Sequence, residues 1–343
     1  MLTPSAGRPV ASQALFHFPD RRRRWSMAAT DLRRRGDRVV AASDPLLAAS
    51  GWNFALSPCP ELLSYDHYLI SISGGKDSQC GLDVLAELFG AAGVLDRVTT
   101  VHADMGRSDW PGTVELAREH AEHYGLRHVL VSRTGCDLLD RVAERGKWPD
   151  RNRRWCTSDF KRGPIRRVMT ALVAESRTAG VIDRPVRVLN IMGHRAQESP
   201  ERRNKSPFVH EPGRTCLCPN CRKARAQGCP SKGSVSNSRR HVDTWLPIHA
   251  WTLEQVWARI AAAGTRVHPA YAAGFPRASC VFCVLSSRSA LVRAAQLFPD
   301  LAARHATVEA QIGHRFRADR SMAEIIAEAA ATAGPSPIED WAA

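Results

Sequence analysis

The sequence predicts an α/β fold in which a doubly wound, mostly parallel sheet is followed by a helical C-terminal part. Short β-branched runs alternate with amphipathic stretches of helical period between residues 68 and 192, and this alternation is typical of βαβ units. The first strand runs directly into a glycine turn and a helix. Beyond residue 283 the chain is rich in alanine and of helical period.

The first strand is predicted at 68–73 and is followed by a helix at 78–89. The turn between them reads Ser73-Gly74-Gly75-Lys76-Asp77-Ser78. Glycines permit positive φ, successive N–H groups can point inward, and the helix N-terminus adds partial positive charge, so this turn predicts an anion site. It is too short for a P-loop and lacks the GxGxxG spacing of dinucleotide sites.

The next strand, at 97–103, ends directly before Asp104 and Gly106. A polar residue at the end of a parallel strand lies over the carboxyl edge of the sheet, where α/β folds bind ligands. A helix at 112–124 and a strand at 128–132 continue the alternation.

A further strand at 186–192 leads into a segment rich in charge. Its arginines, Arg195 and Arg202, supply planar groups for phosphate or sulfate oxygens, and Glu198 can hold one of them in place. An amphipathic helix at 252–263 follows, with Thr252 as its N-cap.

The ten cysteines include two groups with ligand spacing, which favours metal or cluster binding over disulfides. Four thiols fall within fourteen residues and predict a structural zinc site, with an iron–sulfur cluster or free thiols as the alternatives. They are Cys216, Cys218, Cys221 and Cys229.

The second group is the C-x-x-C pair Cys280 and Cys283, which predicts a ligand pair, with a second zinc site or a redox dithiol as the alternative. Cys156 stands alone in a basic segment, which is expected to lower its pKa and suits a ligand or nucleophile. A buried structural thiol is the other interpretation of Cys156.

The net charge of +14 comes from two segments. Residues 1–40 hold nine basic and three acidic residues, and residues 201–240 hold ten and two. These basic segments favour a polyanionic partner, nucleic acid ahead of a membrane; a solvated tail and loop are the alternative. No apolar run is long enough to cross a bilayer, and we expect a cytoplasmic protein, although residues 1–38 also fit a transit peptide.

Five segments together resemble one family. The turn at 73–78 is similar, residue for residue, to the SGGxDS loop of the PP-loop ATP pyrophosphatases and the phosphoadenylylsulfate (PAPS) reductase family. The turn at 104–106, the segment 151–164, the motif at 193–202 and the tryptophan-rich segment 245–257 also resemble this family, in the same order. The resemblance covers roughly residues 65–290.

The resemblance implies an adenine nucleotide alpha-hydrolase-like (HUP-type) fold and an ATP pyrophosphatase or sulfurtransferase-like enzyme using ATP and Mg²⁺. The implied catalytic residues are Lys76, Asp77, Arg195 and Arg202. The implied nucleotide-binding residues are Ser73, Gly74, Gly75, Lys76, Asp77, Ser78, Asp104, Gly106, Gly193, Glu198 and Ser199.

It also implies a 4Fe-4S cluster. In adenylylsulfate reductases of the family, the pair equivalent to Cys280 and Cys283 joins an earlier cysteine pair around such a cluster. Trp155 stands at the first position of that earlier pair here, so Cys156 is its remaining ligand. Three-cysteine clusters with one open iron occur in sulfur-inserting relatives.

A reductase of this family needs a mobile C-terminal cysteine, and the last 60 residues contain none. The chain is therefore closest in character to the sulfur-transfer proteins of DNA phosphorothioation (DndC-like), which implies DNA rather than RNA as partner and a cysteine desulfurase-type sulfur donor or a thiol reductant. The alternatives are a tRNA-thiolating enzyme, a reductase with a separate thiol partner, and a non-catalytic nucleotide-binding regulator. The acceptor, the sulfur donor and the oligomeric state stay open.

We accordingly divide the chain into three parts. Residues 1–60 are expected to form a basic, poorly ordered arm with one short helix at 27–40, where Met27 is an alternative start. Residues 61–290 are expected to form the PP-loop nucleotide-binding catalytic domain, with a cysteine-rich basic insert at 205–240. Residues 291–343 form the helical C-terminal segment.

Overall fold

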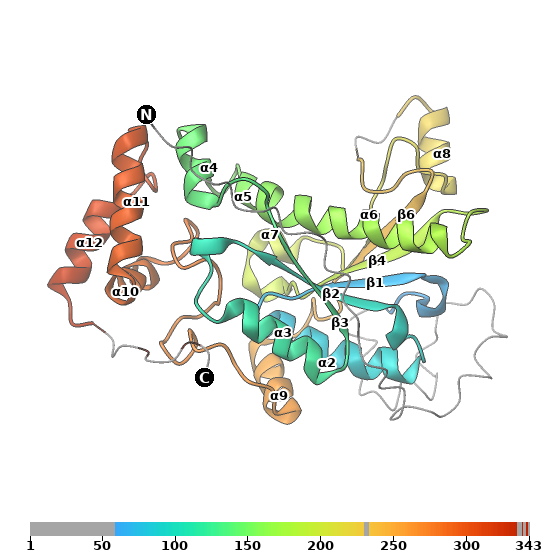
Figure 1. Cartoon of the computed structure of the whole chain (residues 1–343), viewed down its shortest axis with the longest axis horizontal. Coiled ribbons are helices and arrows are strands. Elements are labelled where there is room, and N and C mark those ends of the chain that lie inside the picture. The colour runs from blue at the N-terminus through green and yellow to red at the C-terminus, as the bar shows by residue number, and fades with distance from the viewer. Residues whose placement is uncertain (1–58, 230–232, 335–337, 339–340, 342–343) are drawn as a thin grey trace, which may run out of the picture. The chain divides into compact units, whose positions relative to one another are not determined.

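A computed structural model describes residues 59–229 and 233–334, together with residues 338 and 341. It contains a six-stranded sheet of order β3-β2-β1-β4-β6-β5 (Figure 1). All neighbouring strands are parallel except β5, which is antiparallel to β6. The strands are β1 (His67–Ser71), β2 (Val98–Asp104), β3 (Arg127–Ser132), β4 (Val186–Met192), β5 (Phe208–His210) and β6 (Arg240–Trp245).

Helices cover both faces of the sheet, as Figure 1 shows. On one face α2 (Lys76–Ala91), α3 (Thr113–His123) and α9 (Leu253–Ala263) bury Tyr68 and Ile70 of β1. On the other face α6 (Gly163–Thr178) packs on Leu69 and on the valines of β4. Since alternate residues of β1 enter different cores, the predicted doubly wound sheet is confirmed.

A third core lies among the C-terminal helices, and the predicted helical C-terminal part is also confirmed. The helices around this core are α10 (Arg288–Leu297), α11 (Pro299–Ile312) and α12 (Met322–Ala331), together with α4 (Leu138–Arg145) from earlier in the chain. Val281 and Phe282 pack into the same core, so the C-x-x-C segment is anchored to these helices. None of the helices in the described part of the chain is long and apolar enough to cross a membrane.

The remaining helices are short, namely α5 (Trp155–Thr157), α7 (Pro200–Arg203) and α8 (Pro219–Ala226). A single π-helical turn (Ser158–Arg162) joins α5 to α6, and such turns often mark functional positions. The expected helix at 27–40 and the Arg21–Arg24 run lie outside the described residues.

The order of the strands indicates where on the sheet a ligand would bind. The chain moves from β1 to β2 and β3 on one side, and then crosses to β4 on the other side. Ligands of such sheets bind at the carboxyl edge where the order reverses. The glycine turn, Asp104 and the segment after β4 all follow strands at this edge.

Candidate functional site

The turn at the start of α2 is held in shape by Ser78. Its hydroxyl accepts a hydrogen bond from the Ser73 amide (3.1 Å) and donates to the Gly75 carbonyl (2.8 Å). Gly74 has φ of +66°, and a Cβ there would lie 3.3 Å from the Thr113 methyl group. Glycine is therefore required at this position for both conformation and space.

Two backbone amides of this turn lack a hydrogen-bond acceptor and therefore indicate an anion site. Among the residues that the structure describes, the buried amides of Gly74 and Gly75 have no hydrogen-bond partner, whereas the Lys76 amide donates to the Tyr271 hydroxyl at 2.8 Å. Buried donors without partners are costly and uncommon. A phosphate oxygen at the N-terminus of α2 would supply the missing acceptor.

Behind the turn, Asp77 forms ion pairs with the buried side chains of both Arg195 and Lys76. Arg195 Nε is 2.5 Å from one carboxylate oxygen of Asp77, and Lys76 Nζ is 3.1 Å from the other. The side chains of Lys76 and Arg195 are only 5% and 4% exposed. Lys76 Nζ also donates to the Pro276 carbonyl at 3.3 Å, so its ammonium group is fixed in position.

The structure gives Arg195 different contacts from those of a phosphate-binding side chain. Its guanidinium donates to Asp77, to the Gln197 side chain (2.9 Å) and to the Trp251 carbonyl (3.3 Å). These bonds use protein acceptors and leave the group buried. Arg195 thus orients Asp77, which in turn orients Lys76.

Gly193 lets the segment after β4 approach α2. A Cβ on Gly193 would lie 2.6 Å from the carbonyl oxygen of Asp77 and 2.9 Å from its carbonyl carbon. Both neighbours are backbone atoms, which cannot rotate away as a side chain can. The glycine is therefore required for close packing of the two segments.

The variant Gly193→Ala is expected to lower the free energy of unfolding by about 1–3 kcal/mol, as overpacking does, and to weaken anion binding at the glycine turn. Thermal unfolding and a titration with inorganic pyrophosphate measure the two effects. The matched control is Gly90→Ala, where the added Cβ meets only Leu95 Cδ1 at 3.6 Å. Equal stability and affinity in both variants would contradict this role of Gly193.

Glu198 organises the neighbouring arginines. It accepts hydrogen bonds from the Arg195 amide (2.9 Å), from Arg277 (2.8 Å) and from Arg202. Burial opposes ionisation, but Arg202, the Arg195 amide and Arg277 outweigh it and lower the pKa of Glu198 to about 2. Glu198 therefore stays ionised and holds both arginines beside the turn.

Two other predicted nucleotide-binding residues have local structural roles. The Ser199 hydroxyl caps α7 by accepting from the Arg202 amide at 3.2 Å. Asp104 accepts from the Gly106 amide at 2.7 Å. Both Asp104 and Gly106 also line a hollow of about 480 Å³.

This hollow adjoins the glycine turn. Trp110 and Phe298 form apolar parts of its wall, and Thr113 lies between it and Gly74. Asp104, Asp109 and Glu115 contribute carboxylates to its lining. The combination of apolar surface, a carboxylate and a neighbouring anion site has the composition of a nucleotide pocket.

The segment 268–278 covers the turn, and the sequence analysis missed its role. His268 Nδ1 accepts from the Ala270 amide, so its Nε2 donates to the Thr113 hydroxyl at 3.0 Å. Burial lowers the pKa of His268 to about 4, which keeps the ring neutral. The only sequence signal was the closeness of this segment to the C-x-x-C pair.

Three predicted ligands come together at one place. Cys156 and Cys280, which are 124 positions apart in the sequence, pack in one small cluster with Met105 and Phe160. Cys283 interacts electrostatically with both. Trp155 is also at this cluster and lies under the Arg145 guanidinium at 4.8 Å.

The ammonium group of Lys161 faces these thiols. Its burial opposes protonation, but Cys280, Asp109, Cys283 and Cys156 outweigh burial and raise the pKa of Lys161. A positive charge beside three sulfur atoms suits ligands that bind metal as thiolates.

The expected low pKa of Cys156 is wrong. Burial and the neighbouring Cys283 raise its pKa, and they outweigh the hydrogen bonds from Thr157 and the charge of Arg154. Burial also raises the pKa of Cys280. A free thiol of this kind is a poor nucleophile, whereas coordination would deprotonate it.

The three thiols lie close enough to serve as ligands of one group. Thiolates bind both zinc and iron–sulfur clusters, so this donor set fits either.

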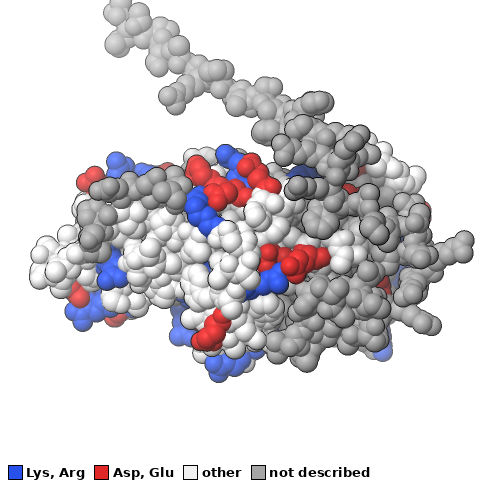
Figure 2. Space-filling model, turned by 90° about the horizontal axis from the view of Figure 1, so that it is seen from below, with Lys and Arg blue, Asp and Glu red and all other residues white. Residues whose placement is uncertain are grey.

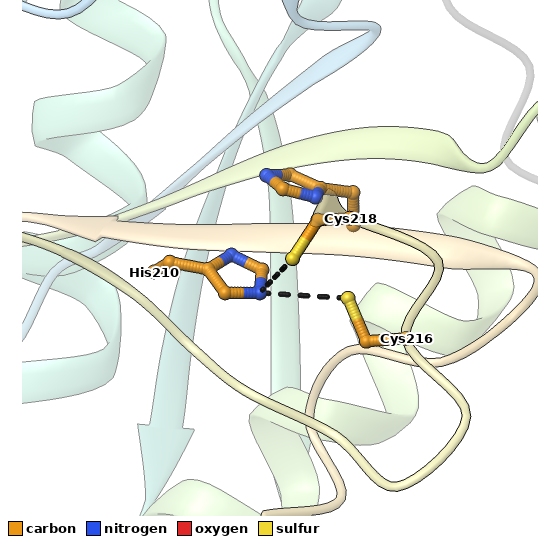
Figure 3. Close-up of side chains that lie close together, drawn as sticks. His210, Cys216 and Cys218 are labelled. Atoms are coloured by element: carbon orange, nitrogen blue, oxygen red, sulfur yellow. Dashed lines mark hydrogen bonds between the residues drawn. The ribbon is translucent and has the colours of Figure 1, made fainter. Parts of the chain in front are cut away.

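The insert thiols have a different arrangement from the predicted one. Cys216, Cys218 and Cys221 converge on His210, and Figure 3 shows the first two beside its ring. Cys229 is exposed and lies outside this group, because α8 carries the chain away after Cys221. The sequence did not identify His210 as a ligand, because this residue precedes the cysteines and lies on a separate strand.

These features define an α/β protein in which a strand, a glycine turn and a helix present two unpaired amides at the carboxyl edge of the sheet. Residues 67–286 match the family model of the phosphoadenosine phosphosulfate reductase domain, and the chain belongs to this family of PP-loop proteins. This membership indicates an enzyme, while the substrate has to be argued from the site. No curated protein sequence matches the chain.

Three enzymes of known structure show distant similarity to the chain. The phosphoadenylyl-sulfate (PAPS) reductase from Candida auris in its phosphate complex has 15% identity over 66% of this chain and 86% of that chain, with a TM-score of 0.41. The Candida glabrata FMN adenylyltransferase with FAD and inorganic pyrophosphate has 13% identity over 69% and 64%, with a TM-score of 0.34. The U34-tRNA thiolase NcsA from Methanococcus maripaludis with its 4Fe-4S cluster has 13% identity over 78% and 76%, with a TM-score of 0.36. None of these similarities is close enough to assign a substrate.

Proposed function

We propose that this protein is an ATP-dependent sulfur-transfer enzyme that activates a nucleic-acid phosphate and releases pyrophosphate, as in DNA phosphorothioation. The observation that carries the proposal is the closeness of the three thiols to the glycine turn. The Ala278 carbonyl lies 3.6 Å from where a Gly75 Cβ would be. Cys280 follows two residues later, which is at most about 7 Å of chain.

The turn would bind the phosphates of ATP. The amides of Gly74 and Gly75 would hold the β- and γ-phosphates, and the adenosine would occupy the hollow near Asp104. An oxygen of the acceptor phosphate would attack the α-phosphorus, so that the bond to the β-phosphate breaks and pyrophosphate leaves. Lys76 is placed to stabilise the charge that develops on pyrophosphate.

Mg²⁺ would accompany the ATP phosphates. Both carboxylate oxygens of Asp77 already accept from Arg195 and Lys76, which makes Asp77 a poor magnesium ligand in this arrangement. We therefore assign Asp77 to the orientation of Lys76.

Cys156, Cys280 and Cys283 would hold a 4Fe-4S cluster. Their sulfur-rich donor set and the ammonium group of Lys161 fit such a group. With three protein ligands, the cluster would supply an open iron where sulfide could bind. A persulfide from a desulfurase-type donor would first be reduced by a thiol reductant, which releases sulfide and the carrier thiol and leaves the reductant as a disulfide. Sulfide would then attack the activated phosphorus and displace AMP.

A basic cluster beside the site would receive the acceptor. Burial lowers the pKa of Lys205, and repulsion from Arg202, Arg154 and Arg162 lowers it further. Arg202 pairs with Glu198, whereas Arg154, Arg162 and Lys205 form no ion pair within the described residues, as expected of a polyanion-binding surface. On the face seen in Figure 2, Lys and Arg are interspersed with Asp and Glu.

The test is an anaerobic assay of the reconstituted protein with ATP, a desulfurase and cysteine. Duplex DNA, tRNA and PAPS are offered in parallel, and pyrophosphate and the sulfur-containing product are measured. Phosphorothioate in the DNA supports the proposal. Thiolated tRNA would instead assign a tRNA-thiolating enzyme, and sulfite from PAPS would assign a reductase. ATP binding without turnover with any acceptor would assign a non-catalytic nucleotide-binding regulator.

Removal of two charges from the basic cluster should make DNA binding less dependent on salt. For Arg154→Ala/Lys205→Ala we expect the slope of log Kd against log salt to fall by about 2, since each lost phosphate contact contributes about one unit. The control is Arg127→Ala/Arg184→Ala, because these side chains pair with carboxylates at 2.8 and 2.7 Å. Equal slopes for both double variants would contradict the assignment.

A further inference from the structure

The insert between β5 and β6 contains a second group of ligands, distinct from the three thiols near the glycine turn. His210 ends β5, and three cysteines follow it in the loop and in α8. Their sulfur atoms lie 3.5 Å (Cys216), 3.5 Å (Cys218) and 3.7 Å (Cys221) from His210 Nε2. Four potential ligand atoms therefore converge from one strand, one loop and the first turn of α8.

These distances match the edges of a metal tetrahedron. With Zn–S bonds of about 2.3 Å and a Zn–N bond of about 2.0 Å, a nitrogen and a sulfur on one zinc ion lie about 3.5 Å apart. We propose that His210, Cys216, Cys218 and Cys221 bind a structural zinc ion, with His210 in the place predicted for Cys229.

The surroundings of His210 prepare it for this role. Its Nδ1 donates to Asp243 of β6 at 2.8 Å, which leaves the lone pair of Nε2 free for the metal. Histidine ligands of zinc commonly have a carboxylate in this position, which fixes the tautomer and the ring orientation. Asp243 is itself held by the Tyr65 hydroxyl at 2.7 Å.

His241 competes for the same site but is better explained as a support. Its ring stacks on His210 with centroids 4.4 Å apart, and one of its nitrogens lies within 4.8 Å of the other ligand atoms. However, its Nε2 is 3.1 Å from Asp243, and the three thiols with His210 already complete a tetrahedron.

The Cys221 amide also donates to the Cys218 sulfur at 3.4 Å, a contact that stabilises a thiolate.

The metal would order a segment that has little else to hold it. The insert exposes Arg214, Arg222 and Lys223 and buries few apolar side chains, so it cannot build a core of its own. Zinc would fasten it to β5 and, through Asp243, to β6. This role is independent of ATP and of sulfur transfer.

The experiment is metal analysis and zinc-edge X-ray absorption on the full chain purified in air. We expect about one zinc per chain with three sulfur ligands near 2.3 Å and one nitrogen near 2.0 Å. In a chelator competition, Asp243→Asn should weaken zinc binding about 10–100-fold, His210→Ala and Cys221→Ser more, and Cys229→Ser not at all. His210→Cys should retain zinc with four sulfur ligands, which separates ligation from folding.

Several results would overturn the proposal. They are the absence of zinc, iron in its place, loss of zinc in Cys229→Ser, or unchanged affinity in His210→Ala. Loss of zinc in His241→Ala combined with full retention in Cys221→Ser would instead assign a two-histidine, two-cysteine site.

Discussion

Replacement of Lys76 by alanine is expected to slow ATP-dependent pyrophosphate release by about 100-fold or more, the usual cost of removing one preorganised charge stabiliser. The ammonium group is buried and fixed by Asp77 and the Pro276 carbonyl, so it needs no rearrangement when charge develops on the leaving group. Water cannot easily replace it in this position. The rate of pyrophosphate release with saturating ATP and acceptor measures the effect.

The matched control is Lys147→Ala, since Lys147 is exposed. Its rate should equal that of the unaltered protein. Thermal unfolding of the Lys76→Ala protein shows whether the fold survives the change. A folded Lys76→Ala protein with the original rate would refute the assignment of the glycine turn as the site of ATP cleavage.

The second large effect is expected at the thiols. Cys280→Ser should remove the absorption of the iron–sulfur cluster in anaerobic protein and abolish sulfur transfer, because one of three ligands is lost. ATP binding should change less than about twofold, since the phosphate contacts come from α2 and the turn before it. The ultraviolet–visible spectrum, iron content and nucleotide affinity are the measurements.

Cys136→Ser provides the comparison for this variant. Cys136 accepts a contact from Arg133 at 3.3 Å and lies outside the ligand group. Protein with Ser at position 136 should keep the full cluster and activity. If the Cys280→Ser protein retained its iron, or the unaltered protein bound zinc at these thiols, the cluster assignment would fail.

The sequence predicted the local structure well. The strand from 186 to 192 was predicted with its observed bounds, and β1, β2 and β3 were predicted to within two residues. The reason is that periodicity and turn chemistry act over short distances along the chain. Strands β5 and β6 were missed because they border an insert whose composition resembles a loop.

The sequence predicted which residues form the site better than it predicted their roles. Arg195 was expected to contact phosphate, yet it is turned to Asp77 by packing that only the folded chain reveals. His210 joins the insert cysteines because β5 returns beside β6. Contacts of this kind depend on tertiary structure, and the spacing of residues along the chain does not contain them.

The antiparallel strand β5 also has a consequence for solubility. The edges of sheets expose unpaired main-chain groups that can recruit a strand from another molecule, and short edge strands limit this risk. β5 has only three residues, and the chain turns away after His210 into the cysteine loop. A second molecule would therefore find too short a ladder here to start intermolecular strand pairing, and the parallel core would be protected from aggregation along this side.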